Sequence, residues 1–149
     1  MTTTYATGPA AATLRTSGIA AAVIQNAKGY IGSAILNNAN LDAIADVEIV
    51  WSFATNPTAG NYLKVHFLYA ADGTNAEEGT GNGAALTSPL PGCLVGLVSP
   101  AADTSTHRKL LTGIPIEPFS FTALVENSLT AQNATVTLNI YTRKDQSVG

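Results

Sequence analysis

The sequence has 149 residues, of which 46% are hydrophobic and 11% are charged. This length suits one domain with a buried core, and the hydrophobic share excludes a chain that is disordered throughout. The net charge of −3 gives no electrostatic case for nucleic acid, which needs clustered Lys and Arg. We therefore expect no nucleic-acid partner.

The low content of charge has a second implication. Ordinary soluble domains carry about 25% charged residues, whereas Ala, Thr, Asn, Ser and Gly fill the surface here. A surface with few charges is tolerable where other subunits cover much of it, so the composition favours self-association.

The single cysteine, Cys93, excludes an intramolecular disulfide, and we expect it to be a small buried apolar side chain. The N-terminus lacks the pattern of a signal peptide, and no apolar run reaches the roughly 18 residues of a membrane helix. We expect a soluble chain that is made in a cytoplasm and has no membrane partner.

Residues 1–17 are rich in Thr and Ala and show no usable period, so they predict an N-terminal arm ahead of a single domain over residues 18–149. The arm has too few large apolar side chains to build a core. We expect it to lie against another subunit, by adding a strand to a neighbouring sheet edge. The residues assigned to this interface are Tyr5, Leu14 and Arg15.

Two stretches of small residues follow the arm, Gly18–Ile24 and Tyr30–Leu36. Their alanines are compatible with a helix. The spacing of the glycines and the β-branched residues favours strands instead, with turns at 26–29 and 37–40.

The strongest pattern lies in two segments, Asp46–Ala54 and Leu63–Tyr69, in which apolar and polar residues alternate. A period of two is typical of strands with one buried face. The short Pro- and Gly-containing connection over residues 56–61 predicts that they form a hairpin.

Further strands are predicted at Leu94–Val98, Arg108–Leu111, Phe119–Glu126 and Thr135–Tyr141, after a long polar loop over residues 72–90. About eight short strands favour an all-β fold, a jelly-roll-like antiparallel β-sandwich with an extended N-terminal arm. The predicted core consists of Val47, Ile49, Trp51, Phe53, Val65, Phe67, Phe121, Val125, Leu138 and Ile140.

The candidates for a reactive or metal site are weak. The two histidines, His66 and His107, are isolated in the sequence, whereas a zinc site needs several ligands. His66 lies on the polar face of its strand, so we expect it at the surface or in an interface. Residues 72–78 resemble a calcium loop only faintly, because Gly73 is misplaced and Ala76 supplies no oxygen; a turn is favoured.

The glycine cluster over residues 79–83 is not followed by the lysine of a phosphate-binding loop. The carboxylates are scattered, and no nucleophile elbow occurs. The sequence therefore predicts no catalytic residues, no cofactor and no required metal.

Seven short segments from residue 45 onward follow one another in an order that can be compared with known families. They are Ala45–Ile49, Tyr62–Leu68, Ala71–Asn75, Leu94–Leu97, Arg108–Ile116, Phe119–Phe121 and Leu124–Asn127. This order, over about two thirds of the chain, resembles that of tailed-bacteriophage virion proteins of the jelly-roll decoration or cement type.

The resemblance implies a virion structural protein, assembled in the host bacterial cytoplasm, that bridges and stabilises capsid subunits. Its partners would be the major capsid protein or other virion subunits, and a homo-oligomer is expected, with a trimer favoured by analogy. Two alternatives remain: a structural component of the tail, or a glycan-binding β-sandwich module. The latter needs exposed aromatic residues, and Tyr5, Tyr30, Tyr62 and Tyr141 are its candidates, since Trp51 belongs to the apolar face.

Overall fold

The computed structural model describes residues 13–15, 19–32, 42–58, 62–76, 94–99, 103–128 and 131–144. This part of the chain forms strands and no helix. The strands are β1 (Thr13–Arg15), β2 (Ala22–Ile24), β3 (Lys28–Ile31), β4 (Ile44–Phe53), β5 (Tyr62–Ala70), β6 (Leu94–Val98), β7 (His107–Pro115), β8 (Ser120–Ser128) and β9 (Ala134–Arg143).

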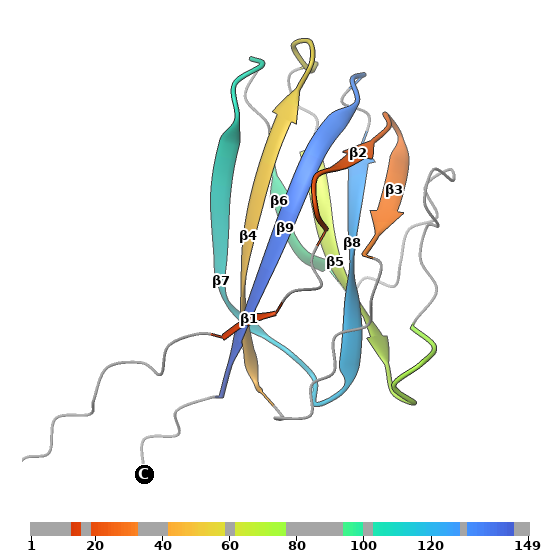
Figure 1. Ribbon diagram of the computed structural model, residues 1–149, viewed down its shortest axis with the longest axis vertical. Coiled ribbons are helices and arrows are strands. Elements are labelled where there is room, and N and C mark those ends of the chain that lie inside the picture. The colour runs from red at the N-terminus through yellow and green to blue at the C-terminus, as the bar shows by residue number, and fades with distance from the viewer. Residues whose placement is uncertain are drawn as a thin grey trace, which may run out of the picture.

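The strands build two antiparallel sheets packed face to face (Figure 1). The front sheet has the order β1-β9-β4-β7, and β2 pairs with β9 on the same side as β1. The back sheet has the order β3-β8-β5-β6. The sequence order alternates between a five-strand and a four-strand layer in the manner of a jelly roll, so the predicted all-β sandwich is confirmed.

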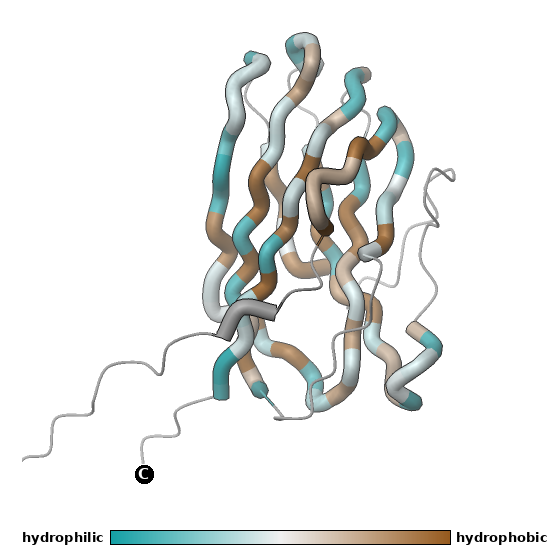
Figure 2. The backbone as a smooth tube through the Cα atoms, viewed as in Figure 1, coloured by the Kyte–Doolittle hydropathy of each residue, from teal (hydrophilic) through white to brown (hydrophobic). Residues whose placement is uncertain are grey.

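The core lies between the sheets and follows from the alternation in the sequence. In β4 every second residue is buried, from Ala45 to Phe53, while the residues between them are partly exposed. Figure 2 shows the same alternation as brown and teal along the tube. All ten residues that the sequence predicts for the core belong to one buried cluster. Phe67 and Phe121 pack within it, with ring centroids 4.7 Å apart.

The predicted hairpin between the segments of β4 and β5 is wrong. β4 pairs with β7 and β9 in the front sheet, whereas β5 pairs with β6 and β8 in the back sheet. Each strand carries one continuous apolar face. Placing them in opposite layers turns both faces toward a shared core and removes both from water.

β7 is longer than the predicted strand, because Thr112 and Gly113 form a bulge and do not end it. The partners of Ala45 and Val47 are Ile114 and Leu111, so β7 contains one extra residue there. Gly113 has a φ of 69°, a left-handed conformation that glycine adopts without steric cost. The strand therefore bends at this point and continues to Pro115 as an edge of the front sheet.

The N-terminal segment differs from the expectation of an arm that lies against another subunit. Residues 13–15 form β1 and pair antiparallel with β9 of the same chain, with Leu14 opposite Tyr141 and Arg15 opposite Ile140. These three residues do add a strand to a sheet edge, but the edge belongs to their own chain. The sheet therefore begins before the predicted boundary at residue 17. Tyr5 lies outside the described residues.

The other strand boundaries differ by a few residues. β2 covers only the end of the stretch predicted as Gly18–Ile24, and β3 begins at Lys28, inside the predicted turn. Residues 33–36 of the predicted second strand lie outside the described part of the chain.

We expect Trp51→Ala to lower the free energy of unfolding by about 3–5 kcal/mol, because it empties a large volume in the core. Trp51 is 5% exposed, and its indole N–H has no hydrogen-bond partner in the described structure. Trp51→Phe should therefore cost less, since it removes this unsatisfied donor as well. Urea unfolding measures both. Val23→Ala, at a residue 60% exposed, is the control, and an equal loss there would contradict the prediction.

Candidate functional site

The outer faces of the two sheets differ in their exposure to solvent. On the back sheet, the residues that point away from the core include Leu68, Thr122 and Leu124, and all three are buried. On the front sheet, the outward residues of β4 remain partly exposed along its length. The outer surface of β4, β7 and β9, which we call the front face, is therefore the accessible sheet surface.

His66 is not at the surface, contrary to the sequence-based expectation. It is 5% exposed on the outer side of the back sheet, and its Nε2 lies 3.3 Å from Oε2 of Glu126. Nζ of Lys64 lies 3.9 Å from the same oxygen. The alternation along β5 correctly indicates that His66 points away from the core. It cannot indicate whether that outer side is covered.

Burial sets the charge state of His66. It lowers the pKa of the imidazole below 6.5, against the opposing effect of the Glu126 carboxylate, and the Lys64 ammonium lowers it further. His66 Nδ1 and Glu126 Oε1 are buried without hydrogen-bond partners in the described structure. The pair is a structural feature of the back sheet, out of reach of a large ligand.

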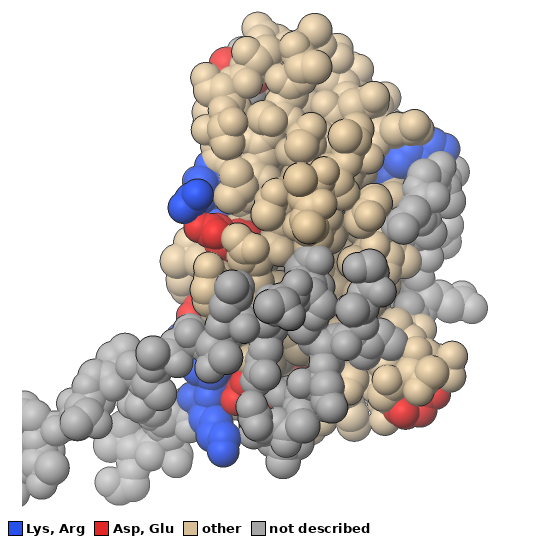
Figure 3. Space-filling model, in the orientation of Figure 1, with Lys and Arg blue, Asp and Glu red and all other residues tan. Residues whose placement is uncertain are grey.

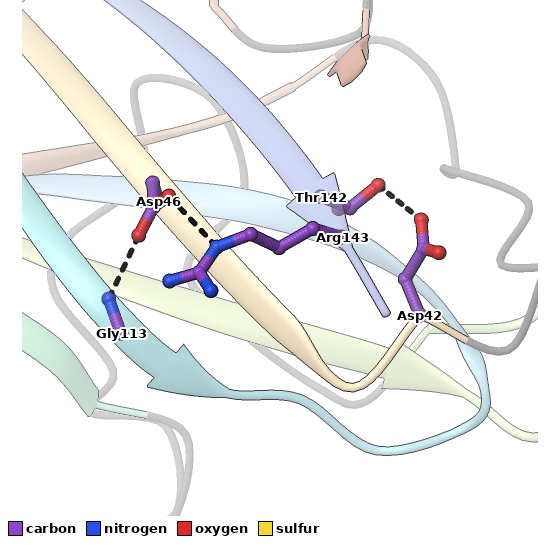
Figure 4. A network of polar contacts seen from close by, with 5 residues as sticks. All are labelled: Asp42, Asp46, Gly113, Thr142 and Arg143. Atoms are coloured by element: carbon purple, nitrogen blue, oxygen red, sulfur yellow. Dashed lines mark hydrogen bonds and ion pairs between the residues drawn. The ribbon is translucent and has the colours of Figure 1, made fainter. Parts of the chain in front are cut away.

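The front face carries a network of carboxylates centred on β4 (Figure 4). Asp46 Oδ1 accepts a hydrogen bond from the backbone N–H of Gly113 on β7 at 2.8 Å, and Oδ2 accepts one from Nε of Arg143 on β9 at 3.3 Å. On the buried side of the same sheet, the Thr142 hydroxyl donates to Oδ2 of Asp42 at 2.5 Å. Asp46 thus joins both neighbours of β4 at the bulge.

Glu48 repeats this arrangement two residues further along β4. Its Oε1 lies 3.1 Å from Nη1 of Arg108 on β7, and its Oε2 accepts a hydrogen bond from the Asn139 amide on β9 at 2.8 Å. Each of the two carboxylates is therefore fixed by one donor from β7 and one from β9. Such charge-assisted bonds are stronger than neutral ones and hold the side chains in place.

An open pocket of about 300 Å³ lies over this network and is lined by Asp46, Glu48, Leu110 and Tyr141. The register explains how they meet. Glu48 is opposite Leu110 on β7, and Asp46 is opposite Tyr141 on β9. One aromatic and one aliphatic side chain thus flank two oriented carboxylates. No sequence motif signals this group, because it is assembled from three strands.

Beyond the network the front face is uncharged. Val23, Thr135 and Ser52 form one row across β2, β9 and β4, and Thr137 and Val50 form part of the next. Figure 3 shows a broad tan area over the upper centre of this face, with charged side chains at its left and right edges and lower down. The front face therefore combines a neutral area with a small polar pocket.

The remaining candidates from the sequence form local structures. The Asp72 carboxylate accepts hydrogen bonds from the N–H groups of Thr74 and Asn75 at 2.8 and 2.7 Å, which lowers its pKa to about 2 and makes a turn. His107 lies 2.7 Å from Asp103 and stacks on Trp51. Cys93, residues 77–78 and the glycine cluster over residues 79–83 lie outside the described residues.

Within the described ranges, no three His, Cys, Asp or Glu side chains come together as a possible metal site. The same ranges contain no helix long and apolar enough to cross a membrane. Comparison of the chain with known family models, curated proteins and solved structures gave no match.

We expect Asp46→Ala to lower the free energy of unfolding by about 1–2 kcal/mol, because it leaves the Gly113 N–H and Arg143 without their acceptor. Hydrogen exchange at the Gly113 amide should accelerate as well. Asp46→Asn keeps a neutral acceptor for Gly113 and should cost less. Unfolding in urea and exchange measured by NMR test both effects, and wild-type exchange at Gly113 in Asp46→Ala would disprove the role of the carboxylate.

We expect the protein to lose stability as the pH falls below 6.5, in part through His66. The pKa of His66 is lower in the folded state than in the unfolded state, so the unfolded state binds more protons in that range and stability rises with pH. Replacing His66 with Gln should flatten the dependence of the urea midpoint on pH there. His107→Gln is the control; a flattening in the control alone would refute the assignment.

Proposed function

We propose that this chain is a non-enzymatic bacteriophage virion structural protein that decorates or cements the capsid shell. The observation that carries the proposal is the accessible front face of a jelly roll, whose area beyond the carboxylate network is uncharged. The resemblance of the segments after residue 45 to phage decoration proteins supports the same function. So does the 11% share of charged residues, which suits a surface covered by other subunits.

The proposed mechanism is adhesive. Burial of apolar surface contributes about 25 cal/mol per Å², so a modest contact on each shell subunit becomes large when it is repeated over the particle. An uncharged row such as Val23, Thr135 and Ser52 can be covered without the cost of desolvating ions. We further propose a homo-oligomer, with a trimer as the form that matches decoration proteins.

The proposal is tested on virions of the phage that encodes the chain. Mass spectrometry of purified particles should find the chain at many copies per capsid. Particles from a deletion mutant should assemble but lose their genome at a lower temperature, and the purified chain should restore their stability. Tails that carry the chain while heads lack it would favour the tail alternative. Particles without it in either place would refute the proposal.

We expect the segment before β1 to strengthen attachment. Deleting residues 2–12 removes chain outside the described strands, whereas deleting residues 2–15 also removes β1 and exposes part of the β9 edge. The first truncation should keep the unfolding midpoint of the full chain and bind shells more weakly. The second should also be less stable.

Sedimentation with capsids from the deletion mutant, together with urea unfolding, separates the two effects. Binding by the 2–12 truncation equal to that of the full chain would show that the arm takes no part in attachment.

A further inference from the structure

We propose that the front-face pocket binds a neutral sugar ring, such as a hexose unit of a glycan. The pocket has a volume of about 300 Å³ and is lined by Asp46, Glu48, Leu110 and Tyr141. Small-molecule sites of this kind combine apolar walls with a few well-placed polar groups.

The two carboxylates are suited to accept hydrogen bonds from sugar hydroxyls. Each oxygen of Asp46 and Glu48 already accepts one bond from β7 or β9. A carboxylate has about four lone-pair sites, so each oxygen retains capacity for a further donor. Because neighbouring strands already fix both side chains, a ligand would not have to order them, which lowers the entropic cost of binding.

The apolar walls suit the C–H faces of a sugar ring. Leu110 is 56% exposed and Tyr141 remains partly exposed, on opposite sides of β4. Gly113 adds room next to Asp46, since a Cβ built there would meet no atom within 4 Å. A ring can therefore contact Tyr141 or Leu110 while its hydroxyls reach the carboxylates.

The balance of charge argues for a neutral ligand. Asp46 is paired with Arg143 and Glu48 with Arg108, so each carboxylate that lines the pocket has an arginine partner. A metal ion or a lysine side chain would have to displace an arginine from its carboxylate. An anion would face the carboxylates themselves. Hydroxyl groups add to the network without breaking an ion pair.

The test is an NMR titration of the full ¹⁵N-labelled chain with the methyl glycosides of glucose, galactose, mannose and N-acetylglucosamine. At least one glycoside should give saturable shifts centred on the amides of Asp46, Glu48 and Tyr141. Calcium chloride, propylammonium and glucuronic acid are titrated in parallel as cationic and anionic probes. Saturation of the pocket by a charged probe and by no neutral glycoside would overturn the proposal, as would the absence of saturable shifts with every probe.

Two variants locate the binding. Tyr141→Ala should weaken binding of the responding glycoside at least about tenfold, equivalent to the loss of about 1.4 kcal/mol. The matched control is Tyr62→Ala, at an exposed tyrosine of the back sheet, and should bind as the wild type does. If Tyr141→Ala fails to fold, Leu110→Ala at an exposed position replaces it with the same expected weakening. Wild-type affinity in the folded pocket variant would place the sugar elsewhere.

The inference does not rest on a place in a virion. A chain that binds glycosides but is absent from particles would keep the sugar site and refute the structural function. A chain found on capsids that binds no sugar would keep the structural function and refute the sugar site.

Discussion

The position of β4 between β7 and β9 is the constraint on which the rest of the structure depends. Its inner residues form the middle of the core, and its outer carboxylates are held from both sides by the two neighbouring strands. One period-two segment therefore supplies both the apolar contact with the back sheet and the ordered polar groups of the front face. If β4 shifted by one residue, both sets would point the wrong way, because successive side chains alternate between faces.

The core and the strands could be predicted because both depend on local alternation. Val47, Trp51 and Phe67 are buried as that pattern requires. Which strands pair could not be predicted, since alternation is the same in a hairpin and in two opposed sheets; the supposed β4–β5 hairpin failed for this reason. The burial of His66 was not predicted. Alternation shows on which side of the sheet a residue lies, but it does not show whether other parts of the chain cover that side.

The pocket was beyond prediction for a related reason. Asp46, Leu110 and Tyr141 are distant in sequence and meet only through the register of three strands. The one local signal is Gly113, which lies just beyond the strand predicted over Arg108–Leu111 and belongs to a bulge. A glycine within an apolar stretch is compatible with a strand end or with a bulge. The pairing of Ala45 with Ile114 and of Val47 with Leu111 shows that it is a bulge.

The bulged edge strand β7 affects how copies of the protein behave when they are held close together. β7 presents an edge nine residues long that could pair with the edge of another molecule. It bends at Gly113 and ends at Pro115, and it carries Arg108 and the exposed Lys109, whose Nζ lies 3.5 Å from the Leu97 carbonyl of β6. Bends, prolines and lysines on an edge discourage the open-ended pairing that produces fibrils. Many copies can therefore be held close together on a common support without forming continuous sheets through this edge.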